Sequence, residues 1–295
     1  MKRKTKNKIS YNRDFFSILI TVVLIAYTLI LGLAMFWALL TSFKDGMFEY
    51  EFNRFGFPKK WVLDNYELAF TKLYVPVNSD KAYMPEMFLN STLIAVGGTL
   101  VTTFSHMAVA YVCARFKFRG QGLIYGIVIV TMFIPIVGSL PSSLRIMKLV
   151  GFYDNYWGYL ATNIGFRGTE FLIFYATFST IDKGYTEAAK IDGANNLFIM
   201  LRVIFPLALP TAIGMGILTF ITKWNDYTTQ MIYLPSMPSL SYGLYLFQNF
   251  RSAGEANLPT TKIAACFVVC IPIVIVFCIF KNKIMGNITM GGIKG

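Results

Sequence analysis

Charge is scarce in this sequence. Of its 295 residues, 14% are Asp, Glu, Lys or Arg, whereas 55% are hydrophobic. Soluble globular domains carry about 25% charged residues, so the composition excludes an ordinary soluble domain and favours a protein that lies in a membrane. Acidic residues are the scarcer kind, with 15 against 27 basic residues, and the formal net charge is +12.

Histidine and cysteine are also rare, with one and four residues respectively. The cysteines fall in or beside apolar runs without a set of histidines or acids, which predicts small core residues rather than a metal site. His106 has no second titratable group close to it in the sequence, so we expect it to form hydrogen bonds rather than to act in acid–base catalysis. The sequence has no Gly-Lys dipeptide, which excludes a phosphate-binding loop of the Gly-x-x-x-x-Gly-Lys-Ser/Thr type. Nothing in it indicates a cofactor.

Long apolar runs dominate what is present. Five of them are long enough to cross a hydrocarbon core as helices of about 20 residues, and a sixth is long enough once one Arg and one Glu are tolerated inside it. We place the six crossings at 15–40, 87–112, 122–143, 157–179, 206–222 and 261–280. The first follows a basic stretch but is longer than the ~7–15 apolar residues of a secretory signal, so we interpret it as a retained anchor. The sequence therefore predicts an all-α integral membrane protein with six transmembrane helices.

The basic residues predict how the chain is threaded, because basic segments resist translocation. They gather in the tail 1–14, the loops 113–121 and 180–205, and the tail 281–295. We therefore expect both termini in the cytoplasm, with a six-span domain over 15–280 between the two tails. Topology and anionic lipid account for the positive charge, and no aromatic-interleaved basic stripe indicates nucleic acid.

The segment 41–86 is the one sizeable insertion and is expected on the extracytoplasmic side. In it, Leu63, Tyr66, Phe70 and Leu73 follow helical spacing. We expect a helix that lies along the outer membrane surface through these residues. A small helix that faces a partner is the alternative.

Prolines and small residues distinguish the apolar runs from one another. In the fifth run, Ala208, Ala212 and Gly216 recur every four residues and predict a face where another helix approaches closely. Prolines interrupt three of the runs and predict kinked helices, at Pro135, Pro141, Pro210 and Pro272.

Two charged residues fall inside the fourth run. Arg167 and Glu170 are three residues apart, so one helical face can hold both and allow them to neutralise each other. Ionisable groups inside a membrane are functional by default. The pair is either a polar part of a transport path or an ion pair that holds helices together, and the sequence leaves both alternatives open.

A charged stretch interrupts the apolar pattern between the fourth and fifth runs. It reads EAAKIDGANNLFIMLRVIFPLALP, from 187 to 210. We expect Thr186 to cap a short helix with Glu187 in its first turn, and Ala188 and Ala189 to leave one side of it bare. Gly193 is expected to end or bend this helix, because glycine adopts positive φ without strain. A second amphipathic turn follows, with Leu197, Met200, Leu201 and Ile204.

This stretch resembles the cytoplasmic signature of the permease subunits of binding-protein-dependent ABC importers, in which Glu-Ala-Ala is followed by Gly and then by an Ile-x-Leu-Pro ending. Here the ending is Val-Ile-Phe-Pro at 203–206, a conservative departure. The resemblance extends over nearly the whole chain, through motifs that are similar to those of the maltose-type, six-span subunits of carbohydrate importers. In order, they read LDNYELAF, FLNSTLIA, AYVCARFKFRG, EAAKIDGA, FPLALP, WND and GGIKG.

The resemblance implies a non-catalytic subunit of a sugar or oligosaccharide importer in the bacterial cytoplasmic (inner) membrane. Its implied partners are a second permease subunit, giving a heterodimer, two cytoplasmic ATP-binding subunits and an extracytoplasmic solute-binding protein. The ATPases would drive alternating access through a coupling helix over 187–193. The implied ATPase-docking residues are Glu187, Ala188, Ala189, Asp192 and Gly193, with Gly291, Gly292, Lys294 and Gly295 in the C-terminal tail.

The sequence does not identify the solute. Asn163, Arg167 and Asn225 are the candidates for a polar substrate path. Glycerol phosphate is the alternative solute within the family, and basic Arg167 would suit it. Outside the family, an ion-coupled secondary transporter would have only Glu170 as an intramembrane acid, and a membrane-embedded enzyme would have only one histidine and one acid for catalysis.

Overall fold

The computed structural model describes residues 15–134, 138–250 and 257–290. Its regular structure is helical except for one two-stranded hairpin. The elements in chain order are α1 (Phe15–Ser42), α2 (Gly46–Phe52), α3 (Asp64–Lys72), β1 (Tyr74–Val77), β2 (Asp80–Tyr83), α4 (Met84–Arg115), α5 (Gln121–Phe133), α6 (Ser139–Val150), α7 (Tyr156–Thr162), α8 (Thr169–Thr180), α9 (Gly184–Ile191), α10 (Asn196–Phe198), the π-helix η1 (Ile199–Ile204), α11 (Phe205–Leu207), α12 (Leu209–Asn225), α13 (Thr228–Tyr233), α14 (Leu240–Asn249) and α15 (Pro259–Met290).

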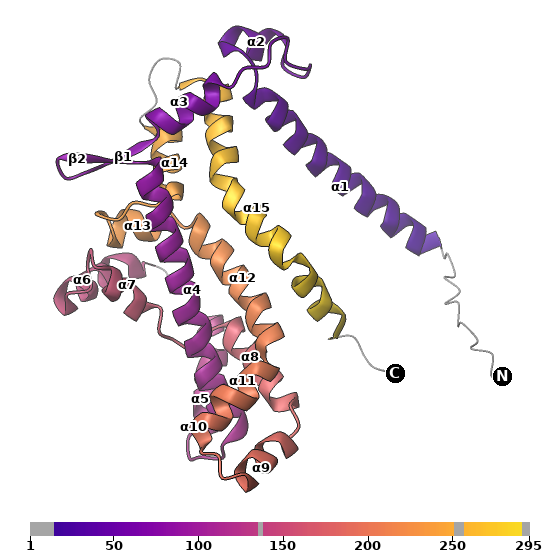
Figure 1. The fold of residues 1–295 in the computed structure, drawn as a ribbon, viewed down its shortest axis with the longest axis vertical. Helices are drawn as coiled ribbons and strands as arrows, with labels where there is room; N and C mark the ends of the chain where they lie inside the picture. Colours follow the sequence, from indigo (N-terminus) through magenta and orange to yellow (C-terminus); the bar gives the residue numbers. More distant parts are fainter. Residues whose placement is uncertain (1–14, 135–137, 251–256, 291–295) are drawn as a thin grey trace.

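Helix α4 is the central element, and both α8 and α12 pack against it (Figure 1). Two apolar clusters lie along it. Met84 and Met87 near its start belong to a cluster with α3, the hairpin, α14 and α15, whereas Met107 and Ala110 near its end belong to a cluster with α8, η1 and α11. A polar stretch separates the two clusters on α4, with Thr99, Thr102, Thr103, Ser105 and His106.

Four helical runs are long and apolar enough to cross a membrane. They are α1, α4, the run Asn196–Asn225 from α10 through α12, and α15 over Pro259–Lys281. They correspond to the predicted crossings 15–40, 87–112, 206–222 and 261–280. Helix α15 continues beyond the predicted end at 280 to Met290.

The predictions of one continuous helix over 122–143 and over 157–179 are wrong. The first run is divided between α5 and α6, with Gly138 at φ +76° before α6. The second is divided between α7 and α8, with Gly168 at φ +82° before α8. A residue at positive φ cannot continue a right-handed helix, so each glycine fixes a break that apolar composition does not reveal.

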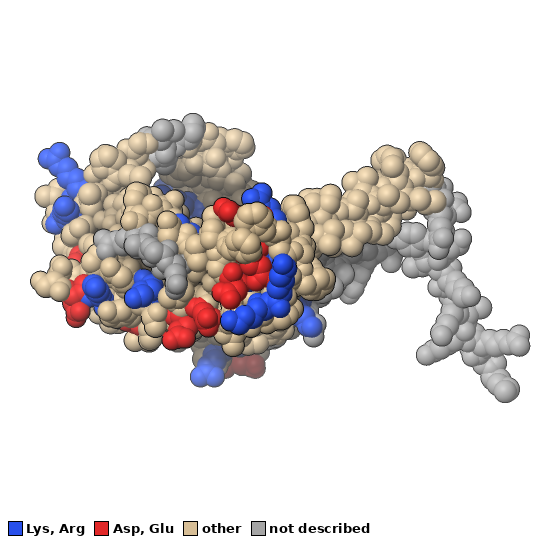
Figure 2. Space-filling model, turned by 90° about the horizontal axis from the view of Figure 1, so that it is seen from above, with Lys and Arg blue, Asp and Glu red and all other residues tan. Residues whose placement is uncertain are grey.

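Helix α1 stands apart from the other helices (Figure 1). Among its residues, only Leu40, Thr41 and Ser42 in the last turn are buried. Seen from above, it forms an uncharged arm that projects from a body on which basic and acidic residues gather (Figure 2). An apolar helix that is exposed on all sides requires lipid or another apolar subunit around it.

The segment 41–86 lies at the end of the molecule opposite α9 (Figure 1). It contains a hairpin that the sequence reasoning missed, with Tyr74 paired to Tyr83 and Asn78 at φ +53° in the turn. A helix, α3, is present in this segment as predicted. Of its expected apolar face, Leu63 is 67% exposed and Phe70 is 50% exposed, whereas Leu73 is fully buried.

The other face of α3 is the buried one, and it packs against α15. Its anchor is Asn65, whose amide nitrogen donates to the carbonyls of Ser42 and Lys44 at 3.0 and 2.8 Å. The oxygen of the same amide accepts from Thr260 and Thr261 of α15, each at 3.1 Å. One buried side chain thus ties α3 to the ends of α1 and α15.

The small-residue face of α12 is confirmed. Ala208 and Ala212 are buried, and a Cβ atom at Gly216 would lie 3.7 Å from Thr99 of α4. Pro272 lies inside α15. Pro141 and Pro210 instead lie in the first turns of α6 and α12, where a missing N–H interrupts nothing, and Pro135 lies outside the described residues.

Candidate functional site

Helix α9 lies at one extreme end of the molecule (Figure 1). It begins just after Asp182, whose carboxylate accepts the N–H of Gly184 at 2.9 Å. The prediction that Thr186 caps the helix is therefore wrong, since Thr186 lies inside the first turn. Glu187 lies in that turn as expected, where the helix dipole favours an acidic group.

Gly193 ends α9 as the sequence predicts, at φ +79°. Its N–H donates to the carbonyl of Lys190 at 3.0 Å, and the N–H of Ala194 donates to the carbonyl of Ala189 at 3.0 Å. Asn195 then starts the next turn, because its side chain accepts the N–H of Phe198 at 2.8 Å. A tight turn that contains all these hydrogen bonds therefore joins α9 to α10.

Most of the predicted docking residues lie on the surface. Glu187, Ala188, Asp192 and Gly193 are exposed. Ala189 is half-buried and packs against the apolar cluster that includes α8 and η1, so only Ala188 is bare. The predicted tail residues Gly291, Gly292, Lys294 and Gly295 lie outside the described residues.

An apolar patch on α9 and α10 completes this surface, and the sequence reasoning missed it. Ile191 is 87% exposed, Leu197 61% and Phe198 53%. The second amphipathic turn was predicted to bury Leu197, Met200, Leu201 and Ile204. In the structure, Ile199 and Ile204 are the fully buried residues of this turn. The charged neighbours of Ile191 in the sequence, KID, were a usable signal that it faces outward.

The π-helix η1 links α9 to the long helices. It contacts both α9 and α11. It ends at Ile204, two residues before Pro206, which has no N–H to continue the hydrogen-bond ladder. Single π turns inside helices are common at functional sites. Through Ile199 and Ile204, η1 packs in the same apolar cluster as Ala189 of α9.

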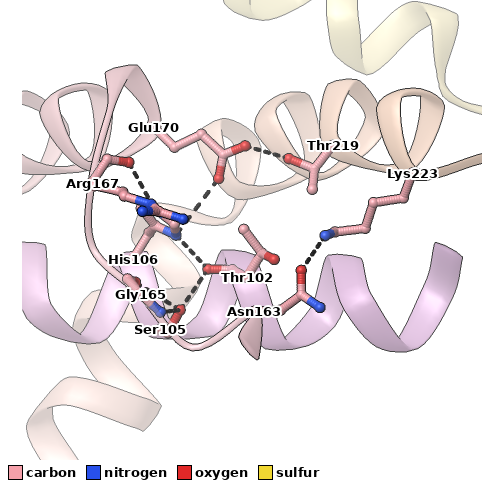
Figure 3. Close-up of polar contacts among 9 residues, drawn as sticks. All are labelled: Thr102, Ser105, His106, Asn163, Gly165, Arg167, Glu170, Thr219 and Lys223. Atoms are coloured by element: carbon pink, nitrogen blue, oxygen red, sulfur yellow. Dashed lines mark hydrogen bonds and ion pairs between the residues drawn. The ribbon is translucent and has the colours of Figure 1, made fainter. Parts of the chain in front are cut away.

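A second feature is a polar cavity of about 640 Å³ beside the middle of α4. Its walls come from α4, α5, the segment 162–170 between α7 and α8, and α12. Figure 3 shows side chains from α4, from the segment 162–170 and from α12 turned toward one another. The cavity lies at the break in the fourth predicted crossing, where backbone groups are not used in a helix.

His106 of α4 contacts this break. Its Nδ1 lies 2.7 Å from the carbonyl oxygen of Thr102, and its Nε2 lies 3.0 Å from that of Arg167. Both partners are acceptors, so the ring nitrogen that carries a proton donates to one of them. The carboxylate of Glu170 lies 3.7 Å from Nδ1. The hydrogen-bonding role expected for His106 matches this geometry.

Of the two alternatives for Arg167 and Glu170, the ion pair is wrong. Among the described residues no ion pair joins them, because Arg167 lies in the segment before α8 rather than on its face. Glu170 accepts a hydrogen bond from Thr219 of α12 instead. Both charged residues line the cavity all the same.

Lys223 of α12 is a cavity residue that the sequence reasoning missed. It donates to the side-chain oxygen of Asn163 (Figure 3). Asn163 also lines the cavity. Asn225 does not line it, since its amide donates to the carbonyl of Ile221 on the exposed side of α12 at 3.0 Å.

Three comparisons identify what this arrangement is similar to. Residues 106–288 match the family described as binding-protein-dependent transport system inner membrane component. The diacetylchitobiose uptake system permease protein of Streptomyces coelicolor is 26% identical over 275 residues, which cover 91% of this chain and 86% of the relative. The trehalose/maltose transport system permease protein of Thermococcus litoralis is 30% identical over 230 residues, which cover 75% of this chain and 80% of the relative.

The fold is also that of a solved structure. A chain from the crystal structure of a bacterial ABC transporter involved in the import of the acidic polysaccharide alginate matches with a TM-score of 0.74 and 24% identity, over 90% of this chain and 95% of that one. The predicted family and the predicted fold of an ABC importer permease are both confirmed. The chain belongs to the family of binding-protein-dependent transport system inner membrane components.

Proposed function

We propose that this chain is a permease subunit through which an ATP-driven importer takes up a sugar or oligosaccharide. The proposal rests mainly on α9, an exposed helix that a hydrogen-bonded turn joins to the long helical run from α10 to α12. The named relatives handle diacetylchitobiose and trehalose or maltose, which supports a sugar over glycerol phosphate. Membership of a binding-protein-dependent family argues against an ion-coupled secondary transporter.

The proposed topology has six crossings, with α9 and both termini on the cytoplasmic side. Divided crossings would be formed by α5 with α6 and by α7 with α8. The basic segments 1–14, 113–121 and 180–205 support this orientation. It is also supported by the direction of α1 and α15, whose Phe15 and Met290 ends point toward the end of the molecule that holds α9 (Figure 1).

In this proposal, ATP hydrolysis belongs to two partner subunits, and the chain itself contributes no catalytic residue. Glu187 meets a basic residue of the ATPase, Ala188 enters its groove, and the bend at Asp192 and Gly193 holds α9 at a fixed angle. Closure of the ATPases displaces α9, and η1 passes the displacement to α12. Because α12 packs on α4 and α8, the bundle tilts as a unit, as alternating access requires.

The remaining partners follow from the same arrangement. A second permease subunit would cover part of the exposed length of α1. A solute-binding protein would deliver the sugar at the end that carries α2, α3 and the hairpin. The C-terminal residues from Gly291 to Gly295 would reach toward the ATPase pair. The cavity beside α4, with Asn163 and Arg167 in its wall, would be part of the substrate path.

Copurification of the ATPase tests the docking surface. The chain is expressed with the other importer subunits, and membrane levels and ATPase recovery are measured. Glu187→Lys and Gly193→Pro should reduce recovery at least about tenfold, the effect of losing about 1.4 kcal/mol, without changing membrane levels. Glu67→Lys is the matched control, since Glu67 is also an exposed acid in the first turn of a short helix, but at the opposite end.

Recovery of the ATPase at the wild-type level with both docking variants would refute the proposal. A second measurement addresses the energy source. Sugar uptake should disappear when the ATPase subunits are deleted and persist when ion gradients are dissipated. The reverse pattern would identify an ion-coupled carrier.

A further inference from the structure

Lys223 occupies a slot that three helices build for it. Its stem crosses α4 at Gly98, where a Cβ atom would lie 2.8 Å from the lysine Cδ. Its ammonium lies 5.8 Å from the centre of the Tyr159 ring of α7 and donates to Asn163 at the end of α7. A larger residue than glycine at position 98 would displace the stem, so the backbone of α4 is shaped to let this lysine reach the cavity.

The ammonium of Lys223 has no carboxylate partner among the described residues, where no acidic oxygen lies within 4.0 Å of it. Glu170 and Asp226 are close enough to attract it electrostatically, but each has other partners. Glu170 accepts from Thr219, and Asp226 accepts N–H bonds from Thr228 and Thr229 at 3.0 and 3.1 Å.

A half-buried cation whose one hydrogen-bond partner is a neutral amide is unusual inside a membrane bundle. Charges there are normally paired, because removing them from water is costly. An ammonium has three N–H donors, and the contact with Asn163 uses one. The unpaired charge and the free donors both point to a ligand that brings its own negative charge.

The rest of the cavity wall fits such a ligand. Arg167 adds a second positive charge, and Glu170 is the one acid in the wall, so the lining is net positive even when His106 is neutral. Thr102 and Glu170 also line the wall. The hydroxyl of Thr102 and one carboxylate oxygen of Glu170 are buried, and neither has a hydrogen-bond partner among the described residues. The volume of about 640 Å³ lies within the range of small-molecule sites.

We propose, on the basis of the sugar import proposed above, that this cavity binds a sugar bearing an anionic group, and that Lys223 selects for that charge. The shared chemistry is a polyol with a carboxylate or a phosphate. Lys223 and Arg167 attract the anion, while Asn163, Thr102 and Glu170 provide hydrogen bonds to the hydroxyls. Lys223 is thus a specificity-determining residue of the substrate path.

The sign of the cavity charge can be measured without a known substrate. In the assembled complex, the four native cysteines of this chain are replaced by serine, and Thr131→Cys places a thiol in the cavity wall. Its labelling rates with an anionic sulfonatoethyl and a cationic trimethylammonioethyl methanethiosulfonate are compared. The ratio of anionic to cationic rates should fall about tenfold in Lys223→Gln and stay within twofold in Lys223→Arg. Lys262→Gln is the control, since Lys262 of α15 does not line the cavity.

The ligand is tested by protection of the same thiol. D-galacturonate, glucose 1-phosphate and D-galactose are added at equal concentration. At least one of the two anions should slow labelling more than galactose does, and Lys223→Gln should abolish that difference while Lys223→Arg keeps it. The anion that protects better tells a carboxylate-bearing sugar from a sugar phosphate.

Equal protection by galactose, protection by neither anion, or an unchanged rate ratio in Lys223→Gln overturns this inference. ATPase copurification is measured on the same samples. If the ATPases are recovered normally, only the charge selection has failed. If the ATPases are absent from the wild-type complex, it is the proposed importer function that has failed.

Discussion

The Nε2 atom of His106 lies 3.0 Å from the carbonyl oxygen of Arg167, a residue 61 positions further along the chain. The adjacent residue, Ser105, donates to the carbonyl of Gly165 at 2.9 Å. These contacts fasten the non-helical segment between α7 and α8 to the middle of α4. Backbone groups released by a broken crossing must find partners inside the protein, and α4 supplies them.

Replacing His106 by leucine should destabilise the complex by about 3 kcal/mol. The change removes the contact with the carbonyl of Arg167 and takes the imidazole away from the carboxylate of Glu170. The thermal unfolding midpoint of the complex in lipid nanodiscs measures the effect. Ser105→Ala should cost about 1 kcal/mol, the usual value for one hydrogen bond.

Thr92→Ala is the control for both variants. Thr92 also lies on α4, but its hydroxyl donates to the carbonyl of Phe88 in the same helix at 2.8 Å, so its loss should change the midpoint little. If His106→Leu lowers the midpoint no more than Thr92→Ala does, His106 does not stabilise the contact between α4 and the segment that joins α7 to α8.

Gly168→Ala should also destabilise the break, by about 1–3 kcal/mol. Gly168 has φ +82° and ψ −168°, a region that residues with a Cβ atom rarely adopt. No atom lies within 4 Å of the position that its Cβ would occupy, so the cost arises from the backbone alone.

The matched variant is Gly126→Ala in α5. A Cβ atom there also has open space, but Gly126 lies inside a helix, where alanine is favoured over glycine by about 0.5–1 kcal/mol. The two substitutions should therefore change the unfolding midpoint in opposite directions. A similar decrease from both would show that added bulk, and not backbone conformation, is responsible.

These breaks explain which parts of the fold the sequence predicts. Apolar length predicts α1, α4, α12 and α15, because burial in a membrane requires an unbroken apolar helix. Apolar length fails to predict the break in 157–179. Mean hydropathy is high there, but it does not reveal that Gly168 has a positive φ, which interrupts the helix. The hairpin over 74–83 was missed because it is short and lies in a segment interpreted as helical.

The cavity is also hard to predict from the sequence, because residues that contact each other in it are far apart along the chain. Sequence spacing favoured a pair between Arg167 and Glu170, whereas the actual partner of Glu170 is Thr219, 49 residues away. Lys223 reaches Asn163 across 60 residues. Local motifs could predict the surface around α9, because that surface is built from consecutive residues, but the cavity requires the packing of α4 with α8 and α12.

Ile191→Ser should weaken ATPase association about tenfold or more without changing the amount of the chain in the membrane. Ile191 is 87% exposed on α9, and the central apolar residues of an interface contribute about 1–2 kcal/mol or more each. Copurification of the ATPase measures the effect. Leu63→Ser is the control, since Leu63 is 67% exposed at the opposite end. Equal recovery of the ATPase with both variants would exclude the apolar patch from the docking surface.

Acid pH should loosen the region around α2 through Glu49. Its side chain is 8% exposed, and burial alone would raise the pKa of this carboxylate. The N–H groups of Lys59 and Asp45, which donate to its two oxygens, and the charge of Lys44 together outweigh burial and hold the pKa below its ordinary value. A lowered pKa in the folded state means that Glu49 adds stability above its unfolded pKa, and that this stability is lost as the pH falls through the folded value.

The measurement is the unfolding midpoint of the wild-type complex and of Glu49→Gln between pH 7 and pH 3. The variant should be less stable by about 2 kcal/mol at pH 7, and the difference should shrink below about pH 4.5, where the unfolded carboxyl becomes protonated. Glu51→Gln, at an exposed acid two positions away, should give a small difference at every pH. Because the bonds of Glu49 hold the chain between α1 and α3, a constant difference for Glu49→Gln across the range would mean that its shape, and not its charge, stabilises this region.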